Sequence, residues 1–144
     1  MIDLNPASPV PLYRQIVDQI RRLIAMGALR PGEKLPTVRD LAVRARVNRN
    51  TAARAFQVLE SEGVVRTRVG QGTYVESAPA SMDRQKGALE LDARIDALLV
   101  DAHTLGVPLE ELGWRLSRRI EVFRQARRSE DAAPDRRGGV EEER

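Results

Sequence analysis

The chain has 144 residues, with 24 Lys and Arg against 21 Asp and Glu, a single His and no Cys. This composition excludes a disulfide framework, a thiolate metal site and a His-cluster zinc site, so no metal is expected. The N-terminus lacks the basic start and apolar run of a signal peptide. No apolar stretch approaches the roughly 18 residues that span a bilayer. We therefore expect a soluble protein of the reducing cytoplasm with no membrane partner.

Basic residues are concentrated in the first half of the chain. Residues 1–75 hold 12 Lys and Arg against 6 Asp and Glu, a net charge of +6, whereas residues 76–144 hold 12 against 15, a net charge of −3. This asymmetry favours a polyanionic partner for the first half. On charge alone, the alternative is a chance fluctuation in an Arg-rich composition.

A first helix is predicted after an extended arm that carries Pro6 and Pro9. Pro11 suits a first helical position, and the apolar residues that follow recur three and four apart. Gly27 can end this helix in a left-handed cap. The Pro31-Gly32 pair then predicts a turn.

Two helices joined by a tight turn are predicted next. Thr37, with Asp40 three residues later, resembles a capping box and starts a helix that ends near residues 44–46. Asn48 is a plausible N-cap for a helix from Arg49 to about Glu62. The buried stripe of this second helix is predicted to consist of Ala52, Ala55, Phe56 and Leu59.

A β-hairpin follows, with strands at 64–69 and 73–75 around the turn Gly70-Gln71-Gly72. The order helix, turn, helix, hairpin predicts a winged helix-turn-helix DNA-binding domain over residues 1–76. The predicted fold class is therefore mainly α with a small β-hairpin.

The second half predicts a linker at 77–82, two helices at about 83–105 and 108–128, and a charged, disordered tail at 129–144. Two helices alone cannot hide both of their apolar stripes, whereas two copies docked about a two-fold axis would close a four-helix core. Region 83–128 is therefore predicted to form a homodimer. The predicted interface consists of Leu91, Ile95, Leu98, Leu105, Leu112, Trp114, Leu116, Ile120 and Phe123. Trp114 does not lie on the Leu112/Leu116 stripe, and an aromatic residue on the dimer seam is the interpretation we favour.

Six segments resemble the GntR family of bacterial transcription regulators in order and spacing. They are PLY at 11–13, GALRPGEKLP at 27–36, VRDLA at 38–42, VNRNT at 47–51, LESEG at 59–63 and GQGTYV at 70–75. The short helical remainder resembles the YtrA-like branch, whose tail makes dimers. An enzyme of the aminotransferase-fused branch would need a much longer chain, so neither an enzyme nor a cofactor is expected.

The resemblance implies that the helix opening at Arg49 reads DNA. Arg49 could grip guanine O6 and N7, which is worth roughly 1–3 kcal/mol of discrimination, and Asn50 could pair with adenine. Thr51 could hold a phosphate, meet a thymine methyl or cap the helix locally. Arg39 is expected at the DNA backbone or groove edge. The alternative for Arg49 is a solvated surface arginine.

Relatives in other branches carry an arginine where this chain has Ala53. Arg54 is rotated by about 100° around the helix, so it need not replace that contact. It could face a phosphate or pair with an acid such as Glu60 or Asp40.

In the hairpin, Gly70 and Gly72 would allow close backbone approach to the minor groove, with Arg68 and Gln71 placed to enter it. Arg66 is expected to contact a phosphate. The alternative is a plain hairpin exposed to water.

These expectations combine into a homodimeric repressor that binds a palindromic operator on double-stranded DNA. Relatives of the branch often control a transporter operon and their own gene, and the same targets are expected here. A small-molecule effector is left open. The alternative function is a protein-interaction or non-specific DNA-binding module without a regulatory effector response.

Overall fold

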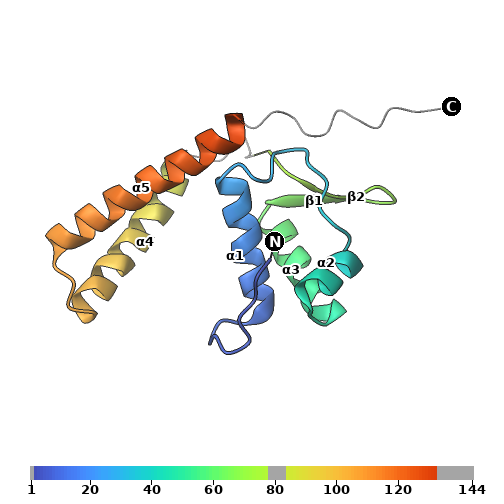
Figure 1. Ribbon diagram of the computed structural model, residues 1–144, viewed down its shortest axis with the longest axis horizontal. Helices are drawn as coiled ribbons and strands as arrows, with labels where there is room; N and C mark the ends of the chain where they lie inside the picture. The colour runs from blue at the N-terminus through green and yellow to red at the C-terminus, as the bar shows by residue number, and fades with distance from the viewer. Residues whose placement is uncertain (1, 78–83, 133–144) are drawn as a thin grey trace.

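The structure is a computed structural model that describes residues 2–77 and 84–132 (Figure 1). The elements of the first part, here called the winged domain, are α1 (Leu12–Ala25), α2 (Val38–Ala45), α3 (Arg49–Ser61), β1 (Val65–Arg68) and β2 (Gly72–Val75). The second part, the helical hairpin, contains α4 (Arg84–Thr104) and α5 (Leu109–Ala132). This arrangement confirms the predicted fold class.

The core of the winged domain is built around α3, which packs against both α1 and α2. The predicted stripe of α3 is buried, and Ala52 and Ala55 are completely inaccessible to solvent. Because alanine side chains are short, the neighbouring helices can lie close to α3. Ile16, Val17 and Ile20 of α1 fill the same core.

The two predicted caps are confirmed, and they define the turn between α2 and α3. Thr37 Oγ1 accepts a hydrogen bond from the Asp40 backbone N–H at 3.1 Å. Asn48 Oδ1 accepts one from the Asn50 N–H at 2.7 Å. Between them, Arg46 ends α2 in the left-handed region with φ 55°, a position that more often belongs to glycine. The start of α3 is therefore fixed by side-chain and backbone bonds on both sides of a short turn.

Strand β1 is shorter than predicted, whereas β2 begins one residue earlier, at Gly72. Strand β1 starts at Val65, because the Val64 N–H is used to close α3 on the Leu59 carbonyl at 2.9 Å. It ends at Arg68, which pairs with Gly72, and Val69 is 98% exposed beyond the last pair.

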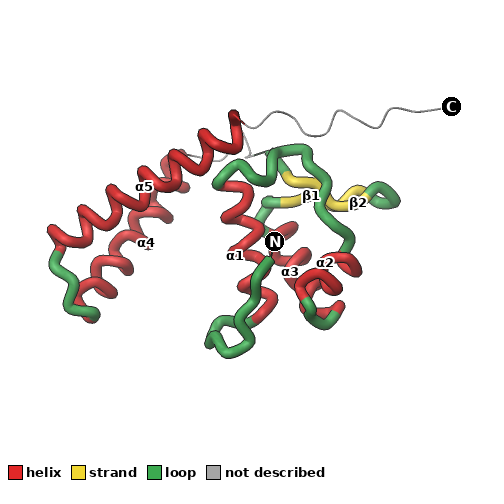
Figure 2. The backbone as a smooth tube through the Cα atoms, viewed as in Figure 1, coloured by secondary structure: helices red, strands yellow, loops and turns green. Residues whose placement is uncertain are grey.

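The loop between α1 and α2 lies along β2, which the sequence did not predict (Figure 2). Gly32 N–H donates to Val75 O at 2.8 Å, and Val75 N–H donates to Glu33 O at 2.9 Å. Leu35 N–H donates to Thr73 O at 2.8 Å. The loop therefore acts as a third, irregular strand that attaches the hairpin to the body of the domain.

The N-terminal arm is held against α1 by two glutamine side chains one helical turn apart. Gln15 Oε1 accepts from the Asn5 N–H and Gln15 Nε2 donates to the Asn5 carbonyl, both at 2.9 Å. Gln19 forms the same reciprocal pair with the backbone of Asp3. Ile2 and Leu4 thereby pack against the core.

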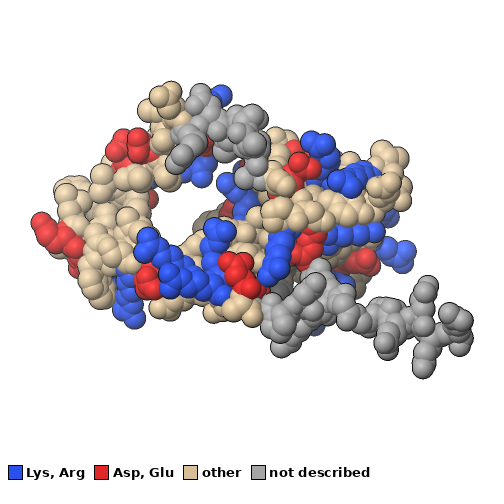
Figure 3. Space-filling model, turned by 90° about the horizontal axis from the view of Figure 1, so that it is seen from above, with Lys and Arg blue, Asp and Glu red and all other residues tan. Residues whose placement is uncertain are grey.

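The helical hairpin turns at Gly106, which adopts φ 70°. Ala102 is its one buried residue within 84–132. An opening separates part of the hairpin from the winged domain in the space-filling view (Figure 3). Neither helix of the hairpin, nor any other helix within the described ranges, is long and apolar enough to cross a membrane.

Helix α5 continues beyond Arg128, its predicted end, to Ala132. The tail predicted from Ser129 onward is therefore helical over its first residues. One contact that stabilises this extension is the hydrogen bond that Arg30 Nη2 donates to the Glu130 carbonyl at 2.9 Å. The rest of that predicted tail, 133–144, and most of the predicted linker, at 78–82, lie outside the described residues.

Candidate nucleic-acid interface

The first turn of α3 presents its polar side chains to solvent. Arg49 and Asn50 are exposed, while Ala52 and Ala55 on the other side of the helix are buried. The Arg49 guanidinium forms no ion pair with any residue in 2–77 or 84–132. A free guanidinium at the N-terminal end of an exposed helix face is available for a base edge or a phosphate.

Thr51 and Arg39 lie at the margins of this surface. Thr51 is half-buried, and the residue that caps α3 is Asn48, so the local capping role considered for Thr51 belongs to Asn48. Arg39 is exposed in the first turn of α2. Its place next to a helix N-terminus suits contact with a phosphate.

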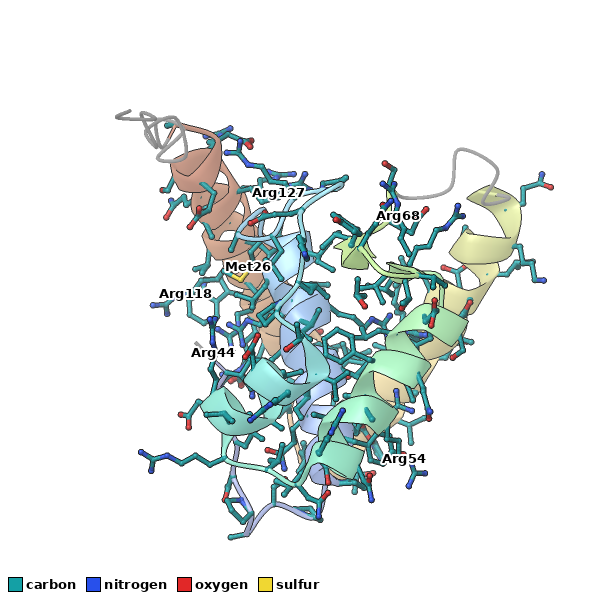
Figure 4. All side chains as sticks on the ribbon, turned by 90° about the vertical axis from the view of Figure 1, so that its right-hand side faces the viewer. Met26, Arg44, Arg54, Arg68, Arg118 and Arg127 are labelled. Carbon is teal, nitrogen blue, oxygen red and sulfur yellow. The ribbon has the colours of Figure 1, made fainter. Side chains whose placement is uncertain are left out.

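Within residues 2–77 and 84–132, Arg54 forms no ion pair, so the suggested pairing with Glu60 or Asp40 is wrong. Its guanidinium lies over the ring of Tyr13, with Cζ 4.1 Å from the ring centroid. The two acids proposed for it bond elsewhere: Glu60 accepts from the Thr67 N–H at 3.0 Å, and Asp40 accepts from the Thr37 hydroxyl at 2.8 Å. Figure 4 shows Arg54 on α3, far from Arg68 on the β-hairpin. The two arginines therefore mark separate ends of the candidate surface.

The β-hairpin carries its arginines on the face that holds Tyr74. Arg66 pairs with Tyr74 in the strand register, and Arg68 lies diagonally across from it. The Arg68 guanidinium is 4.9 Å from the Tyr74 ring centroid, and the Tyr74 hydroxyl donates to the Gln71 carbonyl at 3.2 Å. This network holds the turn around Gln71 and directs Arg68.

Arg66 is already engaged by an acid. Its Nε lies 3.1 Å from Glu76 Oε1, although 67% of its side chain remains exposed. An exposed ion pair of this kind is worth little, and a phosphate could compete with the carboxylate. Arg66 therefore remains accessible to DNA but is less free than Arg68.

Gly72 has a reason within the protein to be glycine. Its φ is +117°, and a Cβ built there would lie 2.6 Å from Lys34 Cε. Gly70, with φ +73°, has no such neighbour within 4 Å. The Lys34 side chain therefore occupies the space beside Gly72. This contact and the positive φ explain the glycine without any contact to DNA.

Lys34 is a candidate that sequence reasoning missed. It is exposed and pairs with Tyr74 through an isolated β-bridge, which places its ammonium beside the hairpin. This position arises from pairing between residues about 40 apart, so no local pattern could have identified it. By contrast, Arg14 and Arg21 lie 3.5 Å and 3.3 Å from the Glu62 carboxylate, which occupies them on another side of α3.

An apolar recess of about 960 Å³ lies between the arm, α1 and α2. Ile2 and Leu4 line one side, and Arg44 and Arg46 contribute to its lining from α2 and its C-cap. None of the predicted DNA-binding residues lines it.

The apolar residues predicted at the dimer interface are substantially exposed. Leu98 of α4 and Phe123 of α5 are each 41% exposed, which means that the two helices cover only part of their stripes. Trp114 lies outside these stripes. It is 60% exposed, packs against Arg118 and is turned by about 160° from Leu116 around α5. A two-fold seam built on the stripes would leave Trp114 outside.

Comparisons with known proteins place this geometry in a family. Residues 12–75 match the family described as "Bacterial regulatory proteins, gntR family". The HTH-type transcriptional repressor YtrA of Bacillus subtilis (strain 168) is 40% identical over 113 residues, or 78% of this chain and 86% of that protein.

Two solved structures extend the likeness beyond the winged domain. A transcriptional antiterminator from Listeria monocytogenes EGD-e matches with a TM-score of 0.76 and 31% identity, over 85% of this chain and 92% of its own. YtrA from Sulfolobus acidocaldarius, a GntR-family transcription factor, matches with a TM-score of 0.54 and 34% identity, over 66% and 97% of the two chains. These relatives are transcriptional regulators and not enzymes. The chain belongs to the gntR family of bacterial DNA-binding transcriptional regulators, in its YtrA-like branch.

Proposed function

We propose that this protein is a homodimeric repressor that binds a palindromic operator in the cytoplasm. The observation that carries this proposal is the exposure of Arg49 and Asn50 at the start of a helix whose other face is buried. The name of the Bacillus subtilis relative, a transcriptional repressor, supports repression as the direction of control.

Base reading is assigned to the first turn of α3. Arg49 donates to guanine O6 and N7, and Asn50 pairs with adenine, each contact contributing about 1–3 kcal/mol of discrimination. Thr51, being half-buried, contributes at the margin through a phosphate or a thymine methyl group. Ala53 adds no polar contact in the second turn.

The hairpin and α2 supply the remaining contacts. Arg68 and Gln71 enter the minor groove beside Gly70 and Gly72, where a narrow groove attracts arginine. Arg39, Arg54 and Arg66 bind phosphates, and Lys34 adds a cation that the sequence alone had not suggested. These charges supply affinity through counterion release.

Dimerisation is assigned to the stripes of α4 and α5. Exposed apolar patches beyond a few hundred Å² mark interaction sites, and two hairpins related by a two-fold axis would cover both stripes. The interface then contains Leu91, Ile95, Leu98, Leu105, Leu112, Leu116, Ile120 and Phe123. The dimer places two recognition helices in major grooves about 34–36 Å apart.

The DNA-binding proposal is tested on the promoter region of the protein's own gene, where autoregulation predicts an operator. In a mobility-shift titration, the wild type should prefer this duplex to a scrambled one, and Arg49→Ala should lose most of that preference. Arg94→Ala is the matched control, because Arg94 is an exposed arginine of α4 paired with Glu90. Equal binding of both duplexes by the wild type would favour the non-specific module and overturn the proposal.

The dimer proposal is tested by sedimentation of the full chain. Leu98→Asp should yield a monomer, because a buried carboxylate would face the partner's apolar stripe. Val100→Asp is the control, since Val100 is rotated by about 200° from Leu98 on the same helix and is 65% exposed. A monomeric wild type, or an unchanged dimer in Leu98→Asp, would contradict this interface.

A further inference from the structure

The end of α5 is attached to the winged domain. Arg30 Nη2 donates a hydrogen bond of 2.9 Å to the Glu130 carbonyl, across 100 residues of sequence. A Cβ built on Gly27 would lie 3.7 Å from Glu130 Cβ, so the two backbones are close. Figure 1 shows this end of α5 beside the C-terminal end of α1. The opening in Figure 3 shows that part of the helical hairpin stands away from the winged domain.

The chemistry of a helix terminus explains the contact. The last four carbonyls of a helix have no partner within the helix, and they carry the negative end of its dipole. The Glu130 carbonyl lacks the usual helical donor four residues on, because residue 134 is proline and has no backbone N–H. A guanidinium supplies both the missing donor and the complementary charge.

Arg30 is held rigidly on the domain side. The Glu33 N–H donates to the Arg30 carbonyl at 3.0 Å, and the Arg30 N–H donates to Glu33 Oε2 at 2.8 Å. The same turn bonds to the end of β2: the Gly32 N–H donates to the Val75 carbonyl at 2.8 Å, and the Val75 N–H donates to the Glu33 carbonyl at 2.9 Å. A continuous set of hydrogen bonds therefore connects the end of α5 with β2, one of the two strands of the β-hairpin.

We propose that Arg30 is a positioning residue that sets the angle between the helical hairpin and the winged domain. Through that angle it sets the spacing of operator half-sites that the dimer accepts. The first statement stands on the contact alone, whereas the second rests on the proposed function. The two winged domains of a dimer must fit successive major grooves at the same time. If the angle were not fixed, the dimer would accept several half-site spacings with similar affinity.

The angle is tested with spin labels. The chain contains no Cys, so Asp18→Cys in α1 and Glu121→Cys in α5, both exposed positions, carry the two labels. The labelled chain is mixed with excess unlabelled chain, so that the measured distance lies within one protomer. We expect a narrow distance distribution that broadens or shifts with Arg30→Ala and is retained with Arg94→Ala. An unchanged distribution in Arg30→Ala would overturn the proposal.

The spacing is tested on duplexes selected with the wild type, in which two half-sites are separated by a series of spacers. Arg30→Ala should keep the affinity for a single half-site and lose at least about 5-fold of the preference between best and worst spacing, the lower range of coupling factors between sites. Arg30→Lys, which retains a donor and a charge, should keep part of the spacing preference that Arg30→Ala loses. Loss of half-site affinity in Arg30→Ala would make Arg30 a phosphate contact and contradict the positioning role.

The two proposals fail in different ways. If the wild type itself does not prefer paired half-sites, the dimeric repressor is wrong, and the spin-label distances still decide the role of Arg30. Urea unfolding of Arg30→Ala and Arg94→Ala shows whether either substitution unfolds the chain. A distance change without a change in the unfolding midpoint is the result expected of a positioning residue.

Discussion

The guanidinium of Arg54 is stacked on the ring of Tyr13, 4.1 Å from Cζ to the ring centroid. Arg54 belongs to α3 and Tyr13 to the first turn of α1, so the stack joins the proposed recognition helix to its neighbour. A stacked guanidinium keeps its charge and its N–H donors. The contact with Tyr13, however, draws it toward α1. This placement favours a phosphate over a base edge.

Arg54→Ala should therefore weaken binding to operator and scrambled duplex alike. Because one phosphate contact is lost, the slope of log K against log salt should fall by about 1. Arg49→Ala should instead reduce the operator preference by about 1–3 kcal/mol. Fluorescence anisotropy titrations at several salt concentrations measure both quantities. If Arg54→Ala changed the base preference at one operator position, Arg54 would be a base-reading residue.

The stack can be tested separately through its other partner. Tyr13→Phe keeps the aromatic ring and should retain the wild-type salt slope. Tyr13→Leu removes the ring and should weaken DNA binding, but by less than Arg54→Ala does. Tyr13 is half-buried, so thermal unfolding of both variants is the necessary control.

Gly72→Ala should destabilise the chain more than Gly70→Ala. At Gly70, φ +73° lies near the left-handed region, where a side chain costs about 1–2 kcal/mol. At Gly72, φ +117° lies outside that region, and the new Cβ meets Lys34 Cε. Urea unfolding compares the two variants. Adding Lys34→Ala to Gly72→Ala should recover only the part due to the collision, because the backbone strain remains. Equal unfolding midpoints for the two single variants would contradict this account.

Local signals in the sequence identified most elements of the winged domain. Thr37 and Asn48 marked helix starts because capping is a property of a few adjacent residues, and Ala52 and Phe56 followed from helical periodicity. The end of α2 was predicted near residues 44–46 and lies at Ala45, although Arg46 caps it in a left-handed position without glycine.

The contacts that sequence reasoning missed join distant segments. Lys34 meets the hairpin, Tyr13 meets Arg54, and Arg30 meets Glu130 only after the chain has folded. Helix α5 also runs past its predicted end at Arg128, and there Glu130 accepts a hydrogen bond from Arg30, a donor 100 residues away. Periodicity and capping carry no information about such pairs.

Asn48→Ala should loosen the start of the recognition helix. The lost bond to the Asn50 N–H should cost about 1 kcal/mol of stability, the usual effect of removing an N-cap. Operator affinity should fall as well, because Arg49 and Asn50 lie in the turn that the cap fixes. Asn48→Ser supplies another capping oxygen and should retain most of the stability and most of the operator affinity. Chemical unfolding and anisotropy titration measure the two effects, and full operator affinity in Asn48→Ala would show that the cap does not order these side chains.

The fluorescence of Trp114 can report on the position of the dimer interface, because Trp114 is the chain's single tryptophan. It lies across α5 from Leu116, is 60% exposed and has the Arg118 guanidinium 5.6 Å from its ring. If the seam is built on the stripes that contain Leu98 and Phe123, the indole stays in solvent in monomer and dimer alike. Acrylamide should then quench its fluorescence to the same extent in the wild type and in Leu98→Asp.

The opposite outcome is equally informative. Quenching that rises when Leu98→Asp separates the protomers would place Trp114 in the interface, as the sequence first suggested. That result would require a seam on the Arg118 face of α5 in place of the stripes. Val100→Asp, which should leave the dimer intact, separates an effect of dissociation from an effect of added charge. Unchanged quenching in all three proteins, together with a monomeric Leu98→Asp, fixes the seam on the stripes.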